Sequence, residues 1–96
     1  MILHHVQSSA TTDNALNCCL RYIDDQDSIL LADDALNCLL NTQWQQRLAN
    51  YKLYVLIEDI EARGLNHRLP QLVNISIIDY DQFVLATLQH TKVITW

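Results

Sequence analysis

Two continuous apolar runs in the second half of the chain most constrain its fold. Residues Leu53–Ile57 form the first run, and the second ends at Ile77 and Ile78. Apolar runs of about five residues without polar alternation are typical of strands covered on both faces, as in a parallel sheet under crossover helices. Acidic residues that suit the first turn of a helix follow each run. These patterns predict two strand–helix units, with strands at 52–57 and 73–78 in the centre of a sheet.

The rest of the sequence continues this alternation. Further strands are predicted at 2–6, 28–32 and 92–96. Helical segments are predicted up to Ile23, from 33 to about 50 with a break near 41–42, from 58 to 63 and from 80 to 90. Such an order predicts a single domain over residues 1–96. Its expected fold is an α/β three-layer sandwich with a five-stranded, mostly parallel sheet and helices on both faces.

Local signals set several of the expected boundaries. Polar residues at 8–13 are expected to form a loop that ends in a helix N-cap, and residues 69–71 to bridge to the fourth strand. Asp33 and Asp34 are expected to cap the second helix. Gly64, the only glycine of the chain, suits a left-handed position after the third helix.

Composition excludes several classes of function. The chain has 6 Lys and Arg against 11 Asp and Glu, a net charge of −5 without a basic cluster, which argues against direct nucleic-acid binding. One glycine is too few for a glycine-rich phosphate-binding loop. No apolar run reaches the roughly 18 residues of a membrane span. The first six residues lack the basic start of a signal peptide and suit a strand. Three cysteines form no disulfide framework, which favours the cytoplasm.

Polar residues follow the ends of the two apolar strands. They are Glu58, Asp59, Asp79 and Tyr80. In parallel sheets, ligands and partners meet the chain at the carboxyl ends of the strands, so we expect a functional or interface surface there. Trp96 ends the chain. A terminal aromatic side chain is expected either to pack over the core or to contact a neighbouring subunit.

The three cysteines are the residues with obvious covalent chemistry. Cys18 and Cys19 fall in the second half of the first helix, near its negative end, where a thiolate is poorly stabilised. Cys19 belongs to the i, i+3, i+4, i+7 stripe that should face the sheet, formed by Leu16, Cys19, Leu20 and Ile23. Cys18 lies on the flank of that stripe, and Cys38 lies beside another apolar stripe. Structural roles are therefore favoured for all three.

The positions of the histidines do not predict a metal site. His4 and His5 point to opposite faces of the first strand and cannot share one ion. His67 and His90 are expected at the surface near helix ends. The sequence therefore predicts neither a metal nor a cofactor.

A resemblance to a known family covers nearly the whole chain. The segments that carry it are Met1–His4, Leu16–Tyr22, Leu30–Asp33, Lys52–Leu56, Asp59 with Ala62–Gly64, Ile78–Tyr80 with Phe83 and Val84, and Trp96. In their order, spacing and total length these segments resemble the DsrH/TusB family.

The resemblance implies a small DsrE-like subunit of a cytoplasmic sulfur relay. In that relay a heterohexamer forms with TusC- and TusD-like subunits, which correspond to DsrF- and DsrE-like proteins. Persulfide sulfur passes through the D subunit to a TusE/DsrC-like acceptor, and its end use is 2-thiolation of the tRNA wobble uridine. In the related Dsr system the same assembly serves oxidative sulfur metabolism.

Two departures from this resemblance bear on function. The catalytic subunit of the assembly has its persulfide cysteine just beyond the third strand, where this chain has Leu56–Asp59 and no thiol. Acidic side chains there would repel a persulfide anion. The family usually has Asp-Gly after the second strand, where this chain has Asp33 and Asp34. Some DsrH-like members have a cysteine in the first helix, at the position of Cys19.

These observations favour a structural or assembly subunit of the relay without a catalytic thiol. One alternative is a persulfide carrier that uses Cys19 or, less favourably, Cys18. Another is a homomeric binding module with an unrelated partner. The chain is also expected to self-associate when its relay partners are absent.

Overall fold

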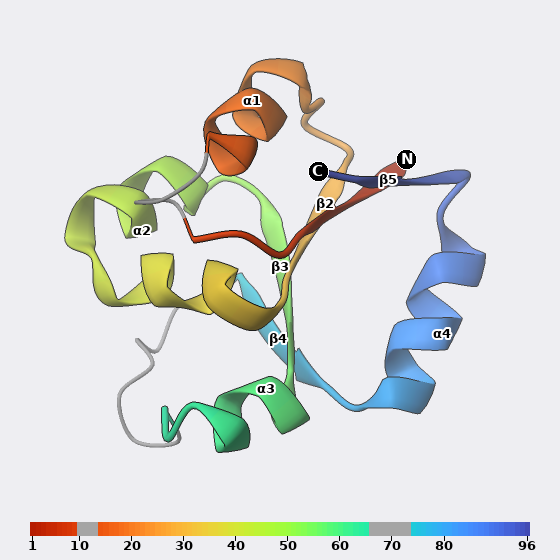
Figure 1. Ribbon diagram of the computed structural model, residues 1–96. Helices are drawn as coiled ribbons and strands as arrows, with labels where there is room; N and C mark the ends of the chain where they lie inside the picture. Colours follow the sequence, from red (N-terminus) through yellow and green to blue (C-terminus); the bar gives the residue numbers. More distant parts are fainter. Residues whose placement is uncertain (10–13, 66–73) are drawn as a thin grey trace.

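A computed structural model describes residues 1–9, 14–65 and 74–96 of the chain (Figure 1). Strands and helices alternate in the order expected from the sequence: β1 Ile2–Val6, α1 Ala15–Tyr22, β2 Ser28–Leu31, the 3₁₀ helix η1 Asp33–Leu40, α2 Thr42–Leu48, β3 Lys52–Leu56, α3 Ile57–Ala62, β4 Ile75–Ile78, α4 Tyr80–Gln89 and β5 Lys92–Thr95. The predicted loop residues 10–13, the bridge 69–71 and His67 lie outside the described residues.

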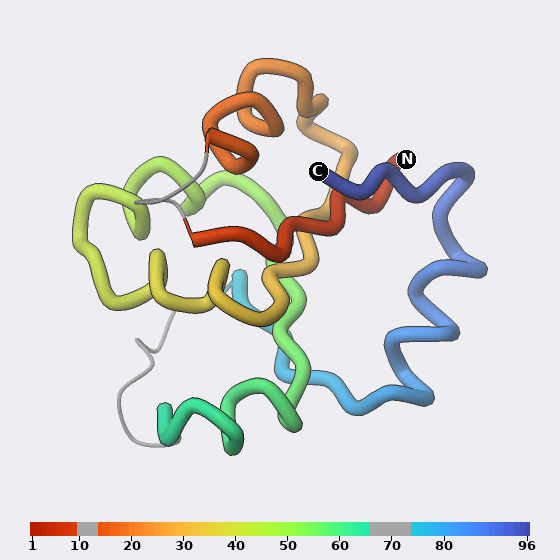
Figure 2. Tube along the Cα trace, in the orientation of Figure 1, coloured from red at the N-terminus to blue at the C-terminus, as the bar shows by residue number. Residues whose placement is uncertain are grey.

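The five strands form one sheet in the order β4-β3-β2-β1-β5, and every described pairing is parallel. This confirms the predicted α/β sandwich. Parallel pairing brings the carboxyl ends of all five strands to one edge of the sheet, called the carboxyl edge below, and their beginnings to the opposite amino edge. Figure 2 shows the first and last strands side by side, so residues from both ends of the chain meet in the sheet.

Helices cover the two faces of the sheet unequally. α1, η1, α2 and α3 pack on one face, where the core includes Val6, Ile29, Leu31, Leu53 and Val55. The alternate side chains of the same strands point to the other face, where α4 packs on a smaller core with Leu3, Leu30, Tyr54 and Ile78. Figure 1 shows α4 across the sheet from the other helices. We call these the four-helix face and the α4 face.

The predicted central position of the strand at 73–78 is wrong. β3 lies inside the sheet, but β4 is an edge strand, and the side chain of Ile77 is 55% exposed. A continuous apolar run indicates burial, but long-range pairing decides which strand occupies the edge. The strand buried along its whole length is instead β2, whose four residues are all buried.

The turn after β2 also differs from the expected cap. The N-cap of η1 is Ala32, without a side-chain cap. Asp33 has a positive φ of 49°, and its backbone N–H donates to Asp59 Oδ2 at 3.3 Å. Asp34 forms an ion pair with Arg63 at 2.7 Å. These two aspartates therefore connect the end of β2 to α3 and do not cap their own helix.

Two other local predictions are confirmed. Gly64 follows α3 with φ 65°, the left-handed conformation that suits glycine. The helical region after β2 breaks at Asn41, whose Oδ1 accepts hydrogen bonds from the backbone N–H groups of Gln43 and Trp44 and so caps α2. An asparagine side chain at this position satisfies donors that the helix itself leaves unpaired.

Candidate functional site

Cys19 lies on the buried stripe of α1, as its spacing predicts. Its side chain is 0% exposed. Burial, together with the negative charge of Asp27, raises the pKa of the Cys19 thiol to about 12. At pH 7 only about one molecule in 10⁵ would then carry a Cys19 thiolate, the form that attacks or carries sulfur. Cys19 is thus placed as a small core residue.

A buried histidine, His4, is hydrogen-bonded to Asp27, the same carboxylate whose charge acts on the Cys19 thiol. His4 Nε2 is 2.9 Å from Asp27 Oδ2, and the indole Nε1–H of Trp96 donates to His4 Nδ1 at 3.0 Å. Because an indole nitrogen only donates, Nδ1 must accept, and Nε2 carries the proton that His4 donates to Asp27. Both ring nitrogens are therefore engaged, and His4 has no lone pair available as a base for Cys19.

Asp27 anchors this buried network. Its carboxylate also accepts from the backbone N–H groups of Ile2 at 2.9 Å and Asp24 at 3.1 Å. Burial alone would raise the pKa of Asp27, but the hydrogen bonds from His4, Ile2 and Asp24 outweigh it and lower that pKa. The charge that disfavours a thiolate at Cys19 is thereby held in place.

Trp96 packs over the four-helix core, which is one of the two positions expected for it. Its ring stacks on His4 at 6.0 Å between centroids and meets the edge of Tyr22 at 5.9 Å. Tyr22 also contacts His4 edge-on at 6.0 Å. The C-terminal residue thus joins an aromatic cluster between β1, β5 and α1.

The other two cysteines differ in accessibility. Burial raises the pKa of Cys38 to about 12, so this thiol is inert at neutral pH. Cys18 is only partly buried, and its Sγ accepts a hydrogen bond from Asn14 Nδ2 at 3.6 Å. Cys18 is therefore the thiol of this chain that a reagent in solution can reach.

The carboxyl edge brings together the polar residues expected there. Glu58 and Asp59 begin α3, and Asp79 precedes α4. Asp79 Oδ1 accepts from the backbone N–H of Gln82 at 2.8 Å, while Gln82 Oε1 accepts from the Asp79 N–H at 2.9 Å, a capping box. Tyr80 and Glu58 are exposed. Asp59 and Asp79 thus have structural partners, while Glu58 and Tyr80 face solvent.

His5 also belongs to this edge, although it was not among the residues predicted there. Burial lowers the pKa of His5, and the nearby carboxylates of Asp33 and Asp59 oppose that shift. Its ring lies 6.1 Å from that of Phe83. Its position next to the carboxyl end of β1 was the available signal. In the described parts of the chain, no group of three or more His, Cys, Asp or Glu side chains is arranged to hold a metal ion.

His90 is buried on the α4 face, so the prediction that it lies at the surface is wrong. Its Nδ1 lies 2.6 Å from the carbonyl oxygen of Ala86, and its Nε2 lies 3.1 Å from Ser28 Oγ. His90, the residue that follows α4, directs its side chain toward the sheet, where the small polar Ser28 provides a partner.

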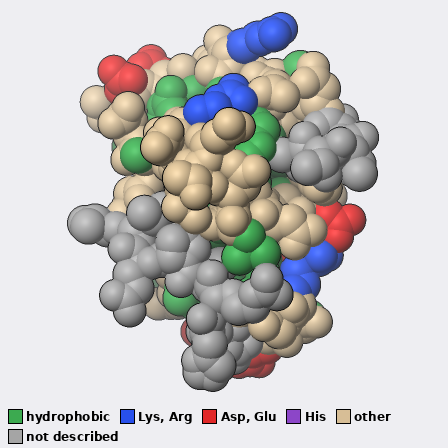
Figure 3. All heavy atoms as spheres, turned by 90° about the vertical axis from the view of Figure 1, so that its left-hand side faces the viewer, with side chains coloured by type: hydrophobic (Ala, Val, Ile, Leu, Met, Phe, Trp, Pro, Cys, Tyr) green, Lys and Arg blue, Asp and Glu red, His purple; other side chains and the backbone are tan. Residues whose placement is uncertain are grey.

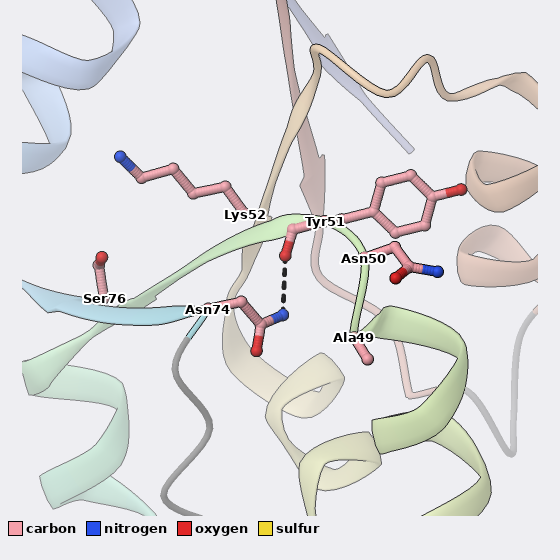
Figure 4. A pocket seen from close by; sticks show the side chains of 6 residues that line it. All are labelled: Ala49, Asn50, Tyr51, Lys52, Asn74 and Ser76. Atoms are coloured by element: carbon pink, nitrogen blue, oxygen red, sulfur yellow. Dashed lines mark hydrogen bonds between the residues drawn. The ribbon is translucent and has the colours of Figure 1, made fainter.

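A shallow pocket of about 440 Å³ lies at the amino edge, away from these residues (Figure 4). Its lining consists of Ala49, Asn50, Tyr51, Lys52, Asn74 and Ser76. Asn74 Nδ2 donates to the carbonyl oxygens of Leu48 and Tyr51, so its role is to hold the starts of β3 and β4 together. The pocket offers neither a thiol nor a carboxylate. Chemistry on sulfur therefore has no group to use there.

No helix within the described ranges has the length and apolar character needed to cross a membrane.

Comparisons with known proteins agree with the resemblance found in the sequence. The family described as DsrH like protein matches residues 8–93. Protein TusB of Pectobacterium parmentieri is 34% identical over 95 residues, which cover 96% of this chain and 98% of that protein. Protein TusB of Escherichia coli strain SMS-3-5 is 36% identical over 83 residues, covering 80% of this chain and 82% of that protein.

Among solved structures, the crystal structure of the ychN protein from E. coli is similar with a TM-score of 0.82. The match covers 99% of this chain and 97% of that chain, at 20% sequence identity. At this identity the likeness concerns the fold.

Proposed function

The chain belongs to the DsrH-like protein family, and from this membership we propose that it is a subunit of a cytoplasmic sulfur relay that acts in tRNA modification. Within the relay it serves in assembly and carries no sulfur on a thiol of its own. The observation that carries this proposal is the complete burial of Cys19, with its pKa raised to about 12. A persulfide carrier needs an accessible sulfur with thiolate character.

The residues at the carboxyl edge also support the proposal that this chain carries no sulfur. Residues Leu56–Asp59, which run from the end of β3 into α3, include no cysteine and two acidic residues. A persulfide anion brought to this edge would meet the negative charges of Glu58 and Asp59 in addition to that of Asp33. Transfer of sulfur therefore belongs to another subunit, and this edge is suited to contact with protein.

We propose TusC- and TusD-like subunits as the partners, in a heterohexamer that delivers sulfur to a TusE-like acceptor for 2-thiolation of the tRNA wobble uridine. The net charge of −5 argues that this chain does not itself hold the tRNA backbone. Its contribution would be to complete the assembly around the subunit that carries the persulfide.

Affinity purification of the full chain from its native cells tests this proposal. Recovery of two DsrE-like subunits of similar size, in equal amounts with the tagged chain, is expected. Deleting the gene should then remove both the assembled complex and the thiolated tRNA nucleoside, measured by mass spectrometry. If both the complex and the thiolated nucleoside persist after the deletion, a role in the relay is contradicted. Retention of the nucleoside together with loss of sulfur oxidation would assign the chain to oxidative sulfur metabolism.

One observation favours a second candidate, a persulfide carrier. Cys18 is partly exposed, so a persulfide donor in solution can reach its sulfur. On this alternative the carrier would be Cys18, since Cys19 is shielded. Alkylation of the native protein with iodoacetamide and peptide mapping would measure the reactivity of each thiol. Rapid modification of Cys18 at pH 7 would support the carrier role.

A further inference from the structure

The surface formed by α1 and α2 is basic, although the chain as a whole is acidic. Neither helix contains Asp or Glu, and each has an arginine in its last turn, Arg21 in α1 and Arg47 in α2. Figure 3 shows the side of the molecule that bears α2. In its upper part Lys and Arg side chains lie among uncharged groups, and acidic side chains lie toward the margins. This local excess of positive charge favours contact with an acidic group.

Arg47 differs from Arg21 because its guanidinium group is held in one position. Its Cζ lies 4.3 Å from the centre of the Trp44 ring, and its Nη1 donates to Oδ1 of Asn17 at 2.9 Å. The hydrogen bond joins α2 to α1. Arg21 is exposed and has neither kind of contact with the described residues.

Both groups that support the guanidinium are themselves fixed. Trp44 is partly buried and packs against the four-helix core. Asn17 Nδ2 donates to Asn14 Oδ1 at 3.0 Å, which orients the amide of Asn17 so that its oxygen is available to Arg47. An arginine that is already held in place loses less conformational freedom when it binds a partner.

The other N–H groups of Arg47 are available to a ligand. The side chain is exposed, and the ion pairs of the described chain join His4 to Asp27 and Arg63 to Asp34, without Arg47. A guanidinium group presents its donors as a planar fork that matches the two oxygens of a carboxylate. The geometry around Arg47 therefore suits a carboxylate from outside the chain.

We propose that Arg47, supported by Trp44 and Asn17, binds a carboxylate on an acidic segment of a partner protein. We call these three residues the Arg47 site. A nucleic acid fits this surface less well, because it carries a charge at every nucleotide and the chain has a net charge of −5. The Trp44 ring adds an apolar surface for a residue next to the carboxylate. The inference does not depend on the proposed role in sulfur relay.

Fluorescence anisotropy of a fluorescein-labelled hexaglutamate peptide, titrated with the purified full chain, tests the Arg47 site. Saturable binding that weakens with added salt is expected. Arg47→Gln should raise the Kd of the peptide roughly tenfold, because it removes the charge-assisted pair of hydrogen bonds. Arg47→Lys should recover only part of this loss, because it restores the charge without the planar fork. Arg21→Gln is the matched control, which removes the same charge from the neighbouring helix and should change the Kd less than about twofold.

The supporting role of Trp44 and Asn17 has a separate readout. Trp44→Phe keeps an aromatic ring under the guanidinium and should leave the Kd within about twofold, whereas Trp44→Leu or Asn17→Ala should raise it a few-fold. Unlabelled peptide should change the tryptophan fluorescence of the natural chain. This change should be absent in Trp44→Phe, because the remaining Trp96 lies in the His4 network. Circular dichroism of each variant confirms that it folds.

Four results would overturn the proposal. The first is a natural chain that does not bind the peptide at millimolar protein concentration. The second is an equal loss of binding in Arg21→Gln and Arg47→Gln, which would indicate a diffuse charge effect. The third is tighter binding of an oligouridylate of the same charge, which would assign the surface to nucleic acid. The fourth is self-association of the natural chain that excludes the peptide, which would assign the surface to a second copy.

Discussion

The indole Nε1–H of Trp96 donates a 3.0 Å hydrogen bond to Nδ1 of His4, so the last residue of the chain fixes the tautomer of a histidine in its first strand. The opposite nitrogen of His4 then donates to Asp27. This network joins β1, β5 and the turn before β2 across the end of α1. It also occupies both ring nitrogens of His4, so this imidazole is not available as a base for a thiol.

Replacing Trp96 with Phe should therefore destabilise the fold by about 1–3 kcal/mol. The ring contacts with His4 and Tyr22 are largely retained, but Nδ1 of a buried histidine loses its donor. Urea denaturation followed by circular dichroism measures the change. Trp44→Phe is the matched control, because Trp44 lies on α2 outside the His4 network and should cost less. If Trp96→Phe and Trp44→Phe lower the free energy of unfolding equally, the hydrogen bond from Trp96 to His4 does not contribute to stability.

Acid should destabilise the protein through Asp27. Its folded-state pKa lies below the unfolded value, so its contribution is fully present above the unfolded pKa of about 4 and is lost as pH falls through the folded pKa. Asp27→Asn should lower stability at pH 7 by about 1.5–3 kcal/mol and flatten the loss of stability below pH of about 4. Free energies of unfolding from pH 7 to pH 2 give both quantities. If the free energy of unfolding of Asp27→Asn falls as steeply with acid as that of the natural chain, Asp27 is not the group responsible.

Core and edge strands should respond differently to truncation. Leu53 is fully buried in β3, so Leu53→Ala should cost about 2–5 kcal/mol. Ile77→Ala should cost less than about 1 kcal/mol, because this β4 side chain is half exposed. Chemical denaturation of the two variants compares them directly. Comparable losses would indicate that β4 is covered by another strand or subunit.

Much of the fold could be predicted because it depends on short-range pattern. Continuous apolar runs predicted the strands, and helical spacing predicted that Cys19 is buried and Cys18 is not. His90, which was misjudged as a surface residue, depends on a partner far away in sequence, since it pairs with Ser28, 62 positions away. The contact between His4 and Trp96, which are 92 positions apart, was likewise not predicted. The edge position of β4 is likewise set by which strands pair, which no local pattern encodes.

Two acids at the carboxyl edge should give opposite results when changed. Asp79→Ala removes the capping box of α4 and should cost about 0.5–2 kcal/mol of stability. Glu58→Lys should leave stability within about 0.5 kcal/mol, since Glu58 is exposed, but should weaken binding to the relay partners. Thermal denaturation and calorimetric titration with the purified partner subunits separate the two effects. Full binding by the Glu58 variant would exclude this residue from the interface.

The central claim is that sulfur relay does not depend on a thiol of this chain. The most direct test reconstitutes the assembly with the natural chain or with Cys18→Ser plus Cys19→Ser, supplies a radiolabelled persulfide donor, and maps the reducible label by mass spectrometry. Transfer to the acceptor protein should stay within a few-fold of the natural complex, with no label on this chain. Stoichiometric label on Cys18 or Cys19, lost together with transfer in the serine variant, would contradict the claim.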